Sequence, residues 1–396
     1  MLDLRPHSAS RSSEMRMNRA PMTRRDFARL AVVAVPTVPA WLARGPSNVI
    51  AAPAAQSYDD WIVIDALGGP GERVGAMGGT LSGQALADAR DSGITAVNLT
   101  VGTVGDGDGL FEASVRSVAE WQRRIAEHPD HLTAVRTADD IREAKATGRL
   151  GIIFGLQDAA MLEGELDRVD LFHDLGVKII QLTYNRSNEL GDGAIEPENR
   201  GLTAFGREVV DRMNRLGALV DLSHCGQLTT DDGIRASSVP VSITHSGCRS
   251  LADLPRNKTD ATLRLLADNG GVVGIYLMPF LLEQGQPHAE DVIRHLEHAL
   301  EVCGEDHVGI GTDGRISGLE LTPDFLEQHR KDVEDRRARG ISAPGETADV
   351  FTYVPELNTP RRFETLGDML SARGHSTTRI EKVLGGNFMR LMEAVW

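Results

Sequence analysis

The chain has 396 residues, of which 41% are apolar and only 5% aromatic, and it carries a net charge of −15. This length allows one large core or two to three smaller domains, and the charge argues against a nucleic-acid or anionic-membrane partner. Three cysteines in a chain this long do not make a disulfide framework.

Residues 1–55 are predicted to be a twin-arginine signal segment that is removed. Arg24 and Arg25 lie within a twin-arginine pattern, an apolar run follows at residues 30–42, and small residues at 52–54 offer a cleavage site. The apolar run is too short to span a bilayer of about 30 Å, although an amphipathic anchor that stays on the protein is the alternative. We therefore expect the twin-arginine export machinery as a partner and a periplasmic or extracellular location. Met15, Met17 and Met22 are alternative starts.

From residue 56 to 396 we expect a single domain in which short apolar runs alternate with amphipathic stretches. The runs are rich in Val, Ile and Leu, as expected of parallel strands buried on both faces. They are residues 61–66, 96–101, 151–156, 177–183, 219–222, 241–244, 271–276 and 308–311. The intervening helix candidates include residues 110–127, 203–216, 262–269 and 289–302.

Eight strands with helices between them predict an α/β fold, a (β/α)₈ barrel of the TIM type, as in metal-dependent hydrolases. An open, doubly wound sheet is the alternative, but no G-x-G-x-x-G motif follows the first strand. Residues 315–350 are polar and charged, and we expect an exposed helix and loop there.

Chemistry in such a barrel takes place where the strands end. His224 and His245 end consecutive predicted strands, so their imidazoles should lie close together at the barrel mouth. Asp313 follows the last strand. One such histidine would more often be structural, but two with an aspartate favour a functional site.

Several blocks of the sequence resemble the membrane/renal dipeptidase family, peptidase family M19. They occur in the family's order over residues 60–396, and they include Gln181 to Asn188, Val220 to His224, Pro240 to Ser246, Arg256-Asn257, His307 to Asp313 and Gly385 to Phe388.

The resemblance implies a metallo-dipeptidase that hydrolyses small dipeptides or amino-acid-derived amides at two zinc ions bridged by a glutamate. It implies that His224 and His245 bind the second metal, that Arg256 binds the substrate carboxylate and that Asp313 handles protons. Tyr184 stands where many relatives have a histidine that polarises the scissile carbonyl, and Asn185 beside it is expected to contact the substrate.

Three positions depart from the family pattern. Leu67 and Gly69 replace the histidine and aspartate expected on the first strand, and Gln157 replaces the bridging glutamate. Leucine and glycine side chains offer a metal no lone pair, and a catalytic zinc normally takes three protein ligands. We therefore expect at most one zinc ion, with no metal at all an equal alternative.

Other residues have ordinary interpretations beside the functional ones. Cys225 and Cys248 are expected as buried free thiols, with a mutual disulfide or a metal site as alternatives. Asp158 is a candidate substitute carboxylate that we expect to face away from the barrel axis. Three acidic residues either line a pocket or are solvated: Glu189, Asp192 and Glu196. Four histidines are expected on the outer surfaces of helices: His173, His288, His295 and His298.

Three functions remain open on the sequence alone. The first is a dipeptidase-like hydrolase with a degenerate metal site. The second is a non-catalytic periplasmic binding or accessory protein for a peptide-like or carboxylate-bearing ligand. The third is a metal-free acid/base enzyme that uses Asp313 with a histidine. The oligomeric state is open, a homodimer included.

Overall fold

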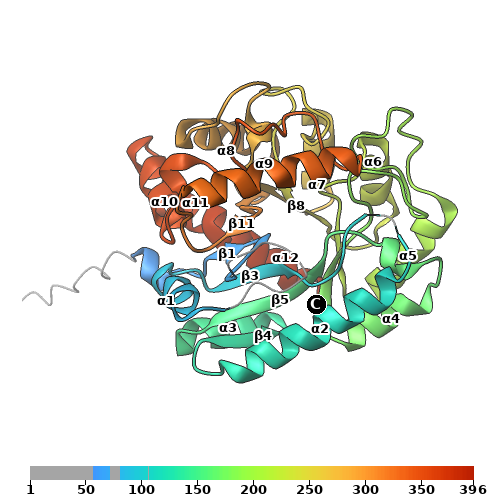
Figure 1. Cartoon of the computed structure of the whole chain (residues 1–396), viewed down its shortest axis with the longest axis horizontal. Helices are drawn as coiled ribbons and strands as arrows, with labels where there is room; N and C mark the ends of the chain where they lie inside the picture. The colour runs from blue at the N-terminus through green and yellow to red at the C-terminus, as the bar shows by residue number, and fades with distance from the viewer. Residues whose placement is uncertain (1–56, 72–80, 106) are drawn as a thin grey trace, which may run out of the picture. The chain divides into compact units, whose positions relative to one another are not determined.

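Parallel strands form the centre of the molecule in a computed structural model that describes residues 57–71, 81–105 and 107–396. The predicted signal segment lies outside these residues. The sheet order is β1-β3-β5-β6-β7-β8-β9-β10, with helices on its outside (Figure 1). The strands are β1 Ile64–Asp65, β3 Ala96–Thr100, β5 Leu150–Leu156, β6 Val177–Gln181, β7 Leu219–Asp221, β8 Ser242–Ser246, β9 Val272–Ile275 and β10 Val308–Ile310.

The two ends of this sheet meet and close the barrel. The amide of Ala66, just after β1, donates to the carbonyl of Ile310 in β10 at 3.0 Å. The short strands β2 (Gly68–Gly69) and β11 (Gly314–Arg315) pair in parallel and continue the same seam. All eight predicted strands are present, and the predicted (β/α)₈ barrel is confirmed.

The helices follow the amphipathic stretches of the sequence. α5 illustrates the local reasons: the Thr203 hydroxyl accepts from the amide of Gly206 at its start, and Gly217, with φ 67°, ends it in the left-handed region. The described helices are α1 Gly83–Asp91, α2 Leu110–Glu127, α3 Ala138–Thr147, α4 Asp167–Asp174, α5 Ala204–Leu216, α6 Gln227–Ala236, α7 Asp260–Asp268, α8 Ala289–Cys303, α9 Pro323–Ala338, α10 Arg362–Ala372, α11 Thr377–Glu381 and α12 Asn387–Val395. None of them is long and apolar enough to cross a membrane.

Two expectations need correction. An additional strand, β4 (Leu132–Val135), pairs with β5 outside the barrel order, and its short mixed pattern of burial gave no clear signal. His295 on α8 is buried and does not lie on the outer surface. Its two ring nitrogens have partners inside the protein: Nδ1 accepts from the Cys248 amide at 3.0 Å and Nε2 bonds the Leu281 carbonyl at 3.0 Å.

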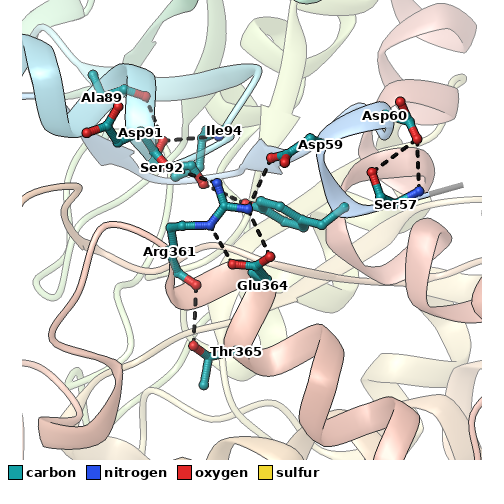
Figure 2. A network of polar contacts seen from close by, with 11 residues as sticks. Ser57, Asp59, Asp60, Ala89, Asp91, Ser92, Ile94, Arg361, Glu364 and Thr365 are labelled. Carbon is teal, nitrogen blue, oxygen red and sulfur yellow. Dashed lines mark hydrogen bonds and ion pairs between the residues drawn. The ribbon is translucent and has the colours of Figure 1, made fainter.

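An arginine away from the barrel mouth joins α10 to the first described residues (Figure 2). Arg361 bonds both oxygens of Glu364, the Oδ1 of Asp59 at 3.1 Å and the carbonyl of Asp91 at 3.2 Å. Its guanidinium also lies 5.1 Å from the ring centroid of Tyr58. This network fixes the start of the domain to its C-terminal helices.

Candidate functional site

The two predicted histidines lie together at the C-terminal ends of neighbouring strands. His224 follows β7 and His245 lies near the end of β8, and their ring centroids are 4.9 Å apart. Both side chains are buried. The structure therefore brings together the pair that strand order predicted.

Hydrogen bonds fix which nitrogen of each ring carries the proton. The Asn185 amide group donates to the Ile341 carbonyl at 2.8 Å, so its Oδ1 faces His224 Nδ1, at 2.7 Å, as an acceptor. The Thr244 hydroxyl donates to Asp221 at 2.7 Å, so its oxygen accepts from His245 Nδ1 at 2.9 Å. In each ring Nδ1 is the donor, which leaves the lone pair on Nε2.

Both Nε2 atoms are buried and have no hydrogen-bond partner among the described residues. Burial, and then the nearby positive charge of Arg256, hold the pKa of both histidines well below the usual range. The rings are therefore neutral at physiological pH, with two lone pairs free at the barrel mouth.

Arg256 is the buried cation of this site, with 1% of its surface exposed. Its Nη1 donates to the Ser223 carbonyl at 2.6 Å, while Nε and Nη2 have no partner in the described part of the chain. The guanidinium lies 5.8 Å from the ring centroid of Tyr276 and 5.9 Å from that of Phe280. A buried guanidinium with free donors and no carboxylate partner is suited to bind a ligand anion.

Asp313 lies on the seam that closes the barrel, and the residue is mostly buried. Its backbone is in the left-handed region, with φ 54°, and its amide donates to the Leu67 carbonyl at 2.8 Å. Burial raises the pKa of Asp313 to about 6, although Arg256, Arg336 and a hydrogen bond from the Gln157 side chain act in the opposite direction. A carboxyl group with this pKa can accept or release a proton near neutral pH.

Tyr184 connects His224 to Arg336, a residue that the sequence analysis missed. Its ring stacks on His224 with centroids 4.1 Å apart, and Arg336 of α9 donates to its hydroxyl at 3.3 Å. We expected residues 315–350 to be an exposed helix and loop, and most of α9 is exposed, but Arg336 is not. It lies in a run of charges with no apolar pattern around it, so no sequence signal distinguished it.

The residues present do not fit the two-zinc centre of the family. Leu67 and Gly69 provide no ligand, and a side chain at Gly69 would place its Cβ 2.8 Å from Leu99 Cδ1, so an apolar methyl group borders the place of the lost carboxylate. Gln157 bonds Asp313 through its side chain. Within the described residues, no group of three or more His, Cys, Asp or Glu side chains could hold a metal. His224 and His245 alone are one short of the three protein ligands of a catalytic zinc.

The remaining candidates have structural partners. Asp158 accepts from the Gly105 and Ala160 amides and from Asn188, so it fixes loops. Asp192 forms an ion pair with Arg200. Cys225 and Cys248 are free and buried, so the disulfide alternative is wrong. The other acidic residues and outer histidines are exposed or partly exposed: Glu189, Glu196, His173, His288 and His298.

Comparison with known proteins decides the lineage. The family model for membrane dipeptidase (peptidase family M19) matches residues 88–333. The chain belongs to the membrane dipeptidase family. Among curated relatives, an uncharacterised dipeptidase of Schizosaccharomyces pombe is 33% identical over 53% of this chain and 52% of its own length. The dipeptidase VerJ of Clonostachys rogersoniana is 29% identical over 72% of this chain and 66% of its own length.

Solved structures share the fold of this chain. An amidohydrolase from Pseudomonas aeruginosa is 34% identical, with a TM-score of 0.73 over 86% of this chain and 98% of its own. A metallopeptidase from Rhodobacter sphaeroides, solved with a phosphinate mimic of the dipeptide L-Ala-D-Ala, shares the fold with a TM-score of 0.68 at 22% identity, over 85% of this chain and 99% of its own. The matched segments span only about half to two thirds of the curated relatives.

Proposed function

We propose that this M19 protein recognises small peptide-like molecules by their carboxylate, which Arg256 binds at the barrel mouth. The observation that carries this proposal is a fully buried guanidinium whose Nε and Nη2 lack partners among the described residues. Leaving buried donors unsatisfied costs about 1–3 kcal/mol each, and a ligand carboxylate would remove that cost through two parallel hydrogen bonds.

The electrostatics of the mouth support an anion. Gly69 and Gln157 stand where the family pattern has two carboxylates. Among the described residues, Asp313 acts on Arg256, and with a pKa of about 6 it is largely ionised near neutral pH and offsets part of the Arg256 charge. Arg336 is neutralised by Glu346, with Nε to Oε2 at 2.7 Å. Arg256 therefore retains a net attraction for a ligand carboxylate.

Dipeptide hydrolysis with a single metal ion is the second candidate function. It is favoured by the two Nε2 lone pairs of His224 and His245, which remain free and adjacent. The dipeptidase names of the relatives agree with this candidate. Export through the twin-arginine pattern at residues 24–25, and hence a periplasmic or extracellular site of action, is also part of this proposal. These residues lie outside those that the structure describes.

Titration calorimetry with L-Ala-D-Ala on metal-free protein tests the first candidate. We expect binding to the dipeptide, a loss of about 100-fold for its C-terminal amide, and a similar loss in Arg256→Met, because two charge-assisted hydrogen bonds disappear in each case. Arg361→Met is the matched control, since that arginine has carboxylate partners of its own and should leave binding unchanged.

Equal binding of the dipeptide and its amide would contradict carboxylate recognition. The same samples, supplied with one equivalent of Zn²⁺ and assayed for released alanine, separate the two candidates. Cleavage that appears only with zinc and disappears in His224→Ala supports the hydrolase, and binding without cleavage supports ligand capture.

A further inference from the structure

Three consecutive residues after β6 contact the segment that follows the barrel. We call residues 323–354, which comprise α9 and the loop after it, the cap segment. Arg336 donates to the Tyr184 hydroxyl at 3.3 Å, the Asn185 amide donates to a cap carbonyl at 2.8 Å, and Arg186 Nε donates to the Gly340 carbonyl at 2.7 Å.

Two of these three residues also define the position of His224. The Tyr184 ring stacks on the imidazole with an interplanar angle of 24°, and Asn185 Oδ1 accepts from Nδ1 at 2.7 Å. Asn185 uses opposite ends of one amide for His224 and for the cap. A planar amide held by the cap carbonyl therefore presents its oxygen to the histidine in one orientation only.

The ion pair between Arg336 and Glu346 helps to hold the cap loop that supplies this carbonyl. Glu346 accepts from Arg336 Nε at 2.7 Å, from Nη2 at 2.9 Å and from the Ala343 amide at 3.0 Å. Only His329 and Val333 of α9 are buried. The loop after α9 buries Ile341, Ala343 and Val354, so apolar packing there and the polar contacts of Arg336 together hold the cap in place.

We propose that the cap segment sets the orientation of the His224 imidazole, with Arg336 and Asn185 as positioning residues. His245 provides a contrast within the same site, since its Nδ1 donates to the Thr244 hydroxyl of β8, which in turn donates to Asp221 of β7. Loosening the cap should therefore disturb one histidine and spare the other. The inference concerns the protein alone and does not depend on the proposed ligand.

Nuclear magnetic resonance of ¹⁵N-histidine-labelled protein tests this asymmetry. In the wild type we expect both rings as Nδ1–H tautomers with slowly exchanging protons. In Arg336→Met the His224 proton should exchange at least about tenfold faster, as expected for the loss of one hydrogen bond, while the His245 proton is unchanged. Arg337→Met is the matched control, because Arg337 is the exposed neighbour on the same helix.

Asn185→Leu, which removes both amide contacts, should reproduce the effect of Arg336→Met. Should the arginine variant fail to fold, Glu346→Gln weakens the same ion pair while keeping its shape, and the same change is expected. An unchanged His224 signal overturns the proposal. Equal effects on both histidines overturn it too, since they would indicate general loosening instead of positioning.

Discussion

At two seams between neighbouring strands of the barrel, an aspartate accepts hydrogen bonds from the amide and the hydroxyl of one threonine, a contact that we call a clamp. The side chains that follow the two clamps differ. Between β7 and β8, Asp221 accepts from the Thr244 amide at 2.9 Å and from its hydroxyl at 2.7 Å. Between β10 and β1, Asp65 accepts from the Thr312 amide and hydroxyl at 2.8 and 2.6 Å. In the first clamp, the Thr244 hydroxyl oxygen also accepts a hydrogen bond from the imidazole of His245.

The second clamp supports no imidazole, because Leu67 occupies the position of the histidine that the family pattern predicts. The Asp65 and Thr312 contacts are nonetheless intact, with the Leu67 amide donating to Asp65 at 3.2 Å. The comparison shows the same support of the backbone at both places, with a histidine beyond one and a leucine beyond the other. We therefore propose that this protein keeps the family scaffold without the two-metal centre that the resemblance implies.

Matched threonine substitutions should show the largest functional difference between the two seams. Thr244→Val and Thr312→Val should each lower the free energy of unfolding by about 3 kcal/mol, because each leaves a buried aspartate short of a hydroxyl donor. Only Thr244→Val should also weaken zinc binding, about tenfold, since only this threonine orients a histidine. Urea denaturation and calorimetry give the two values. Equal losses of binding in both variants would show that the seams do not differ in function.

Asp313 should make stability at the β10 seam depend on pH. Its folded pKa of about 6 lies above the unfolded value of about 3.9, so its contribution is complete below pH 3.9 and is lost as the pH rises through 6. Asp313→Asn should therefore be about 3 kcal/mol more stable than the wild type at pH 7.5 and nearly equal to it at pH 4. Urea midpoints at both pH values check this, and a difference that grows towards low pH would contradict it.

Much of this arrangement was predictable from the sequence, because strand ends are local features. Continuous apolar runs identified the eight strands, and the place of His224 and His245 after consecutive runs predicted their proximity. The same reasoning identified Asp313, and the family blocks identified Arg256. The departures at Leu67, Gly69 and Gln157 were recognised only through the resemblance to the family.

The remaining features depend on contacts between segments far apart in the chain. Arg336 reaches Tyr184 across 152 positions of sequence, and its own helix shows no apolar stripe that would indicate a buried end. The burial of His295 depends on the Cys248 amide, a partner 47 residues away. Periodicity reports which face of an element is buried, but it does not report such partners.

The ratio of bound zinc to protein tests the central claim most directly. Purified wild-type protein and the triple variant Leu67→His, Gly69→Asp, Gln157→Glu are equilibrated with Zn²⁺, freed of excess metal and measured by elemental analysis. The account predicts at most one zinc per wild-type chain and about two per chain in the variant, provided that the Leu99 side chain moves aside at the new carboxylate. Two tightly bound zinc ions in the wild type would contradict it.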